Sequence, residues 1–102
     1  MAFTIIIKEE AHEEAVEAFN YYEEKQPGLG DRFLRSLESV YKNLYENPQH
    51  YGYINEDTNK IFRDVKLKKF PYVVVFEIMG SNVIVYAVHC CYKNPMRKLP
   101  KR

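Results

Sequence analysis

The 102 residues of this chain are enough for one domain, residues 1–102, and a hydrophobic share of 46% is too high for an intrinsically disordered protein. The net charge of +1 conceals an unequal distribution of charge. Residues 1–59 hold five Lys/Arg and twelve Asp/Glu (−7), whereas residues 60–102 hold ten Lys/Arg and two Asp/Glu (+8). The basic half indicates a polyanionic or acidic partner, unless the two halves neutralise each other across one surface. No segment reaches the roughly 20 apolar residues of a membrane span, so we expect a cytoplasmic protein without a membrane partner.

The first half of the chain predicts a strand and two helices. Residues 3–8 are β-branched and apolar, as in a strand that is either buried on both faces or lies at an edge under a helix. Residues 10–26 predict a helix whose apolar face consists of Ala11, Ala15, Ala18, Phe19 and Tyr22. Residues 30–46 predict a second helix, with an apolar face of Phe33, Leu34, Leu37, Val40, Tyr41 and Leu44. Pro27-Gly28 separates the two, so we expect an antiparallel helical hairpin.

The second half predicts a long loop and then three strands. The loop covers residues 47–59, and the expected strands cover residues 60–67, 72–79 and 83–89. Arg63 shares a face of its strand with Ile61, Val65 and Leu67. The order β-α-α-β-β-β predicts an α+β fold in which the helical hairpin packs on one face of an antiparallel sheet. Residues 96–102 form a basic tail.

Several motifs accompany these elements. PGLGDRF begins the second helix, NP ends it, and IFRDVKL, KFPYVVVFEI and VIVYAVH mark the three strands. Over nearly the whole chain these motifs and the element order resemble the RelE/ParE toxin family. The FPY motif and the ending from His89 to Asn94-Pro95 are the more specific parts, and they resemble the ParE branch.

That resemblance implies the toxin of a type II toxin–antitoxin system, of the kind linked to plasmid stabilisation, with a cognate antitoxin as its partner. ParE-like members poison DNA gyrase, and growth inhibition through gyrase is our first interpretation. RelE-like members cut mRNA on the ribosome, so a metal-independent mRNA endoribonuclease is the alternative and enzymatic activity stays open. A third interpretation is a non-toxic protein-interaction module.

The candidate site residues are basic or aromatic and lie in the second half of the chain. The predicted target-binding residues are Arg63, Lys66, Lys68, Lys69, Lys93 and Arg97. If the protein is a nuclease, its catalytic residues would be Arg63, His89 and Tyr92, because metal-free RNA cleavage needs a base, an acid and a cation for the phosphate charge. The last strand lacks the arginine that the RelE branch carries there.

Each candidate also has a structural interpretation. Arg63 could anchor the acidic helices or form a salt bridge on its strand, and His89 could hydrogen-bond a loop. Tyr92 could be a packing ring, and the lysines could form a solvated hairpin.

We expect no cofactor and no metal. The HEE segment that begins at His12 lacks a second histidine at zinc-helix spacing. His89, Cys90 and Cys91 are consecutive, so on a strand they alternate between faces and cannot share one ion. The two cysteines are therefore expected to be free thiols, which suits a reducing compartment.

Overall fold

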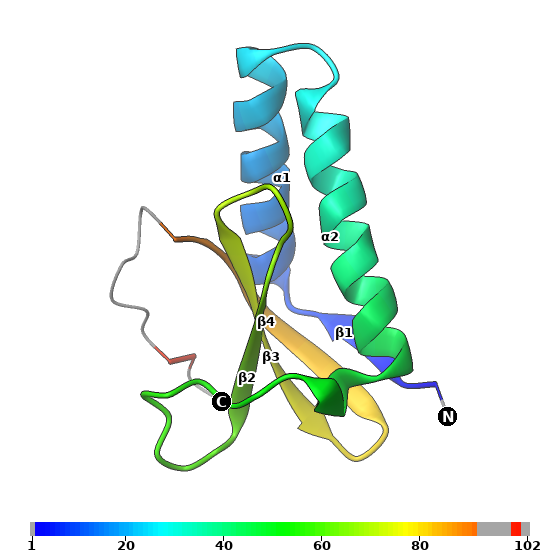
Figure 1. Ribbon diagram of the computed structural model, residues 1–102, viewed down its shortest axis with the longest axis vertical. Helices are drawn as coiled ribbons and strands as arrows, with labels where there is room; N and C mark the ends of the chain where they lie inside the picture. Colours follow the sequence, from blue (N-terminus) through cyan, green and yellow to red (C-terminus); the bar gives the residue numbers. More distant parts are fainter. Residues whose placement is uncertain (1, 92–98, 101–102) are drawn as a thin grey trace.

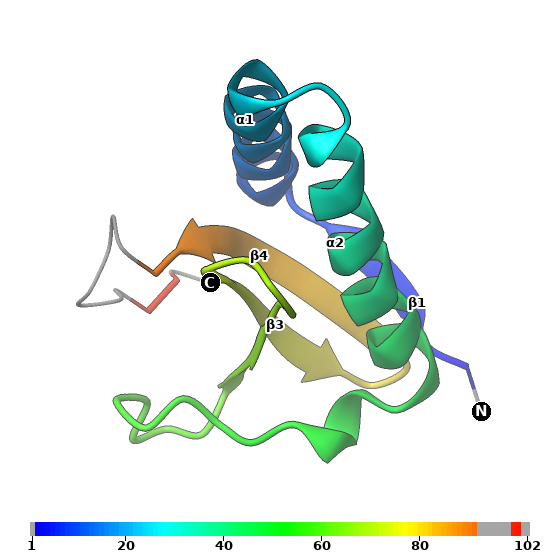
Figure 2. The ribbon, with the colours of Figure 1, turned by 45° about the horizontal axis from the view of Figure 1, so that its top comes forward.

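The computed structural model describes residues 2–91 and 99–100, which form two helices on one face of a four-stranded sheet (Figure 1, Figure 2). The α+β class and the order β-α-α-β-β-β are confirmed. The elements are β1 (Thr4–Ile7), α1 (Glu9–Lys25), α2 (Leu29–Glu46), the short 3-10 helix η1 (Pro48–His50), β2 (Phe62–Lys66), β3 (Tyr72–Met79) and β4 (Asn82–Cys90). Within the described ranges, neither helix is long and apolar enough to cross a membrane.

The sheet is mixed, with the strand order β1-β4-β3-β2. Its last three strands form the expected antiparallel meander. β1 instead runs parallel to β4, with Thr4 opposite Asn82 and Ile7 opposite Val85, which corrects the expectation of an antiparallel sheet. A parallel pair needs a long crossover, and here the helical hairpin, β2 and β3 all intervene. The side-chain pattern of one short strand carries no information about its partner, and β1 proves to be an edge strand.

An aromatic cluster joins the helices to the sheet. Phe33 of α2 is fully buried, and its ring centroid lies 5.1 Å from that of Tyr72, 5.5 Å from Phe70 and 5.6 Å from Tyr22. Edge-to-face ring pairs such as Phe33–Phe70 each contribute about 0.5–1.5 kcal/mol beyond the area that they bury. The cluster fixes the distance between α2 and the β2–β3 turn.

A bulge in β4 changes which of its side chains point to each face of the sheet. Val75 lies opposite Ala87 but the next residue, Phe76, lies opposite Val85, so Tyr86 is an extra residue in β4. The helix-facing core therefore includes residues on both sides of the bulge, namely Val83, Val85 and Val88. A second cluster, on the other face, consists of Ile54, Phe62, Val75 and Ala87.

Asp57 organises the end of the long loop. Its buried carboxylate accepts hydrogen bonds from the backbone N–H groups of Phe62 (2.7 Å), Ile61 (2.8 Å) and Asn59 (3.1 Å). These bonds, the one from Phe62 above all, hold the pKa of Asp57 below its ordinary value of 3.8. Since the folded-state pKa is lowered, this stabilisation is present above pH 3.8 and is lost as the pH falls through the folded-state pKa.

Glu23 of α1 caps the start of α2. One carboxylate oxygen accepts the N–H of Gly28 and the other accepts the N–H of Gly30, both at 3.0 Å. Gly28 has a φ of +89°, which favours glycine. A Cβ at Gly30 would lie 2.8 Å from the carbonyl oxygen of Phe19, so the two helices approach too closely here for any side chain. The PGLG motif is therefore explained by the geometry of the hairpin.

Glu23→Ala should lower the free energy of unfolding by about 1 kcal/mol, because two N–H groups at the start of α2 lose their acceptor. Glu24→Ala is the matched control, since Glu24 is exposed and sits at the same helix end. In thermal denaturation followed by circular dichroism, Glu23→Ala should melt about 4–8 °C below the wild type and the control should not. Equal melting of the two variants would contradict the capping role.

Candidate functional site

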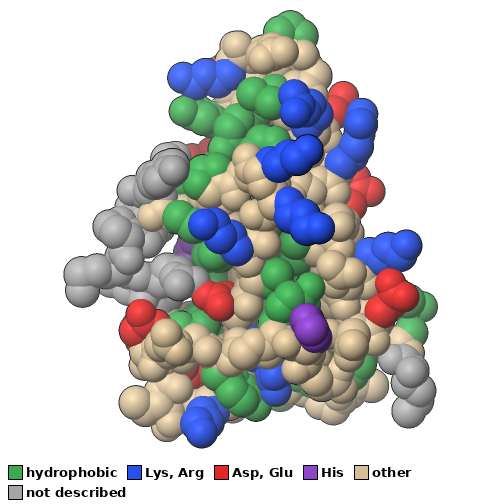
Figure 3. Space-filling model, in the orientation of Figure 1, with side chains coloured by type: hydrophobic (Ala, Val, Ile, Leu, Met, Phe, Trp, Pro, Cys, Tyr) green, Lys and Arg blue, Asp and Glu red, His purple; other side chains and the backbone are tan. Residues whose placement is uncertain are grey.

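A groove with basic walls lies between α2 and the turn that joins β2 to β3. Lys and Arg side chains gather over these elements on the face shown in Figure 3. The groove has a volume of about 580 Å³. It is termed the basic groove, and its cationic residues are Arg32, Arg35, Lys66, Lys68 and Lys69.

The two walls are held together by contacts that the sequence supplies locally. Arg32 and Arg35 lie three positions apart on α2, so they share one face of the helix. On the same helix Ser36 donates a hydrogen bond from Oγ to the carbonyl oxygen of Lys68, at 2.9 Å. Lys69, the next residue of the turn, has a φ of +69°. The turn is thus fixed beside α2 with its lysines at the groove.

The basic groove concentrates positive charge. No Asp or Glu is among its described lining residues, which besides the five cations are Leu29, Ser36, Ser39, Val40, Asn43, Tyr51, Val65 and Phe70. The ion pair between His89 and Glu14 involves none of the five cations. Neutralisation of the basic half by the acidic half is therefore not seen at this groove. Clustered cations without counterions attract a multivalent anion, with lysines acting as point charges and arginines as two-pronged donors.

Arg63 lies beside the groove but its guanidinium is directed to the loop. Nη1 donates to the carbonyl oxygens of Tyr51 (2.7 Å) and Gln49 (3.4 Å), and Nη2 donates to the hydroxyl of Tyr53 (2.9 Å). The guanidinium also lies 4.1 Å from the centroid of the Tyr53 ring. Arg63 thus has a structural role, and its partners among residues 2–91 and 99–100 belong to the loop, not to the acidic helices or to a salt bridge. A contact with the target stays a prediction.

His89 is separate from Arg63. Its Nδ1 lies 3.1 Å from Oε2 of Glu14, whose Oε1 accepts the N–H of Val88 at 2.9 Å. Arg63 pairs with Phe76 on β3, while His89 pairs with Val73 on the other edge of β3. β2 and β4 are separated by two interstrand spacings, and the β3 partners of Arg63 and His89 are three residues apart. Their Cα atoms therefore lie roughly 14 Å apart. The structure therefore does not bring these two candidate catalytic residues together. Tyr92, Lys93 and Arg97 lie outside the described residues.

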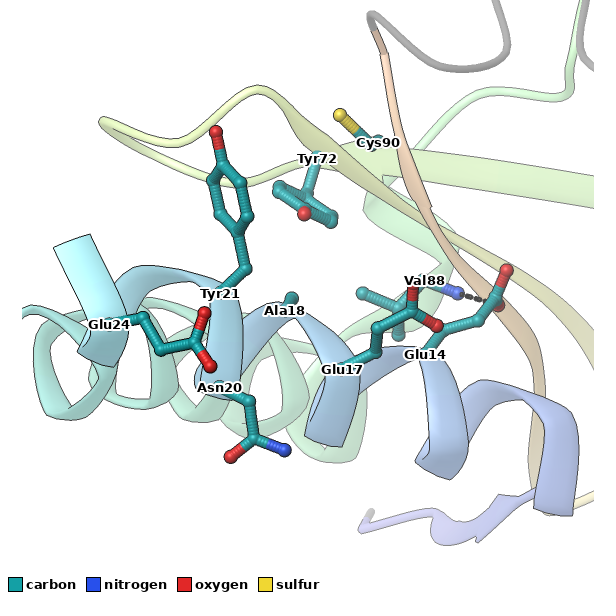
Figure 4. Close-up of a pocket in the computed structure, with 9 residues that line it drawn as sticks. All are labelled: Glu14, Glu17, Ala18, Asn20, Tyr21, Glu24, Tyr72, Val88 and Cys90. Atoms are coloured by element: carbon teal, nitrogen blue, oxygen red, sulfur yellow. Dashed lines mark hydrogen bonds between the residues drawn. The ribbon is translucent and has the colours of Figure 1, made fainter.

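A second hollow, with several acidic residues in its lining, lies against α1 and is termed the acidic hollow. Glu14, Glu17 and Glu24 of this helix line it, and Tyr72 of β3 and Cys90 of β4 are among the residues on the opposite side (Figure 4). Figure 4 also shows the hydrogen bond from Val88 to Glu14. This acidic hollow and the basic groove share no lining residue, so opposite charges occupy different surfaces.

A third surface is apolar and lies along the helical hairpin. This apolar groove, of about 430 Å³, is lined by Ile7, His12, Ala15, Val16, Phe19, Leu34, Leu37, Glu38 and Tyr41. Val16 is 45% exposed and Ile7 is 40% exposed. Large apolar side chains left in solvent at one place mark an interaction surface.

The sequence identified only one wall of the basic groove. Lys66, Lys68 and Lys69 were predicted as a cluster and do line it, whereas Arg32 and Arg35 were missed. Both arginines belong to the half of the chain whose net charge is −7, so the net charge of that half does not reveal them. Their spacing of three positions, beside the buried face of α2, is the signal that could have found them.

Comparison with known proteins gives one family and one fold. A family model described as the ParE toxin of the type II toxin–antitoxin system parDE matches residues 5–91. Among solved structures, the fold is similar to a chain of the chromosomal ParDE toxin–antitoxin system from P. aeruginosa, with a TM-score of 0.75 and 13% sequence identity. That alignment covers 87% of this chain and 96% of the other. No curated protein sequence matches the chain.

Arg63→Ala should lower the free energy of unfolding by about 1–2 kcal/mol, because residues 49–53 lose charge-assisted hydrogen bonds and a stacked ring. Lys66→Ala, at the exposed end of the same strand, is the control and should change the stability by less than about 0.5 kcal/mol. Urea denaturation of both variants measures the difference. An Arg63→Ala midpoint equal to that of the wild type would show that these loop contacts contribute nothing.

Proposed function

Because this chain belongs to the ParE toxin family of type II toxin–antitoxin systems, we propose that it inhibits growth by binding and poisoning DNA gyrase and that a cognate antitoxin neutralises it. The observation that carries the proposal is the basic groove, where five cations face solvent without a described carboxylate partner. A surface of this kind supplies affinity and fast association for an acidic or nucleic-acid-bound target.

The proposal is a binding poison and not a nuclease. A nuclease of this fold would need a base, an acid and a phosphate-binding cation close enough to act on one bond. Arg63 and His89 are instead engaged with the loop and with Glu14, on opposite sides of β3. Binding through the basic groove needs no such convergence, and so the gyrase interpretation takes precedence over mRNA cleavage.

The antitoxin is proposed to occupy the apolar groove. A helix or extended segment with apolar side chains at helical spacing would cover Val16, Ile7 and Phe19, as in other helix-in-groove complexes. This groove and the basic groove lie on different sides of α2 and share no lining residue. Toxicity and neutralisation should therefore be separable by mutation.

The double variant Arg35→Gln/Lys68→Gln should lose inhibition of gyrase. Purified wild-type chain should inhibit supercoiling of relaxed plasmid by gyrase, and the double variant should not, because one cation is removed from each wall of the groove. Lys42→Gln is the control, since Lys42 is exposed on α2 but does not line the groove. If the wild type leaves gyrase active but cuts ribosome-bound mRNA in a cell-free translation reaction, the gyrase proposal is wrong and the alternative holds.

Val16→Glu should weaken antitoxin binding by at least about tenfold while leaving gyrase inhibition intact, because it buries a carboxylate at an apolar interface. Asn20→Glu introduces the same side chain at an exposed position of α1 outside the apolar groove and serves as the control. Titration of each variant with the antitoxin by calorimetry gives the affinities. Unchanged affinity for Val16→Glu would place the antitoxin elsewhere.

A further inference from the structure

We infer that the basic groove binds a single strand of nucleic acid, through its phosphates along the walls and its bases on the floor. The inference rests on the proposed function in one respect, that this groove is the surface presented to the target. It adds the chemical class of the ligand, because the lining combines cations with aromatic rings.

The walls fit a chain of phosphates. The Cβ atoms of Arg32 and Arg35 lie about 5–6 Å apart on one wall, as expected for residues three positions apart on a helix. Lys68 and Lys69 stand on the other wall, fixed there by the hydrogen bond from Ser36 to the carbonyl of Lys68. Ser39 and Asn43 add uncharged donors further along α2. The described lining thus offers donors and cations along its whole length and no carboxylate to repel a phosphate.

The floor fits flat bases. Tyr51 and Phe70, the two half-buried aromatic residues of the lining, are termed the floor of the groove. Phe70 is held by ring contacts to Tyr22 (4.9 Å) and Phe33 (5.5 Å), and Tyr51 by one to Phe76 (6.2 Å). Rings that are fixed in advance lose little entropy when a base stacks on them. Cations along a groove combined with such rings are the features by which proteins bind single strands without sequence preference.

The size of the groove selects among anionic ligands. Its volume of about 580 Å³ suits a ligand of one or two nucleotides in contact at a time, and a duplex is too wide to enter. An acidic peptide would use the same cations, but its carboxylates gain nothing from two aromatic rings on the floor. The rings therefore favour a nucleic acid strand over an acidic protein segment.

Fluorescence anisotropy with labelled oligothymidylate and oligouridylate of about ten nucleotides tests the inference. The full chain should bind at low salt, and the logarithm of the binding constant should fall linearly with the logarithm of the salt concentration. Arg35→Gln/Lys68→Gln should reduce that slope by about 1.4, because each phosphate contact contributes about 0.7 for single strands. Lys42→Gln should leave the slope unchanged. The two probes distinguish DNA from RNA as the preferred strand.

An abasic strand of the same length should bind about tenfold more weakly if bases stack on the floor. Binding of polyglutamate as tightly as the oligonucleotide would overturn the inference in favour of an acidic protein segment, and so would equal binding of the abasic strand. Failure of the proposed function gives a different result. If the oligonucleotide binds but gyrase is not inhibited, the inference holds and the gyrase proposal fails. If gyrase is inhibited but the oligonucleotide does not bind, the gyrase proposal holds and the inference fails.

Discussion

The burial of Phe33 between the helices and the sheet is the contact on which the surfaces of this protein depend. Phe33 belongs to α2, and it meets Tyr22 of α1, Phe70 of the β2–β3 turn and Tyr72 of β3. The basic groove lies between α2 and that turn, and the apolar groove lies between α2 and α1. The ring of Phe33 thus holds α2 against the elements that form the opposite walls of both grooves. The hydrogen bonds from Ser36 and to Glu23 then fix the orientation of α2 at two further points.

The elements of the fold could be predicted from the sequence, because each has a strong local pattern. Pro27-Gly28 and Asn47-Pro48 bound α2 within about one residue, and apolar, β-branched runs on either side of the Gly80 turn locate β3 and β4. The pairing of β1 with β4 and the bulge at Tyr86 could not be predicted in this way. Both depend on a partner strand that is distant in sequence. The apolar residues of β4 continue through Tyr86, so the sequence of this strand alone does not reveal the extra residue.

The candidate site was predictable only in part, for reasons of charge and of backbone geometry. The lysines of the β2–β3 turn are adjacent in sequence and could be recognised, whereas Arg32 and Arg35 reach the same groove only through the packing of α2. The partners of Arg63 could not be predicted either, because an argument from charge considers only carboxylates as partners of a guanidinium. Its actual acceptors are backbone carbonyls of the loop, whose positions no side-chain pattern reveals.

Within the described part of the chain, the acidic hollow and the basic groove present opposite charges on different surfaces, although the net charge of the chain is only +1. A nearly neutral protein is drawn only weakly toward a charged target from afar. Within about one Debye length, roughly 8 Å at physiological salt, the two surfaces experience opposite forces in the field of a polyanion, which turns the protein toward it. The basic groove is then the surface that contacts the polyanion first. Added salt shortens this range and slows productive encounters more than it speeds dissociation.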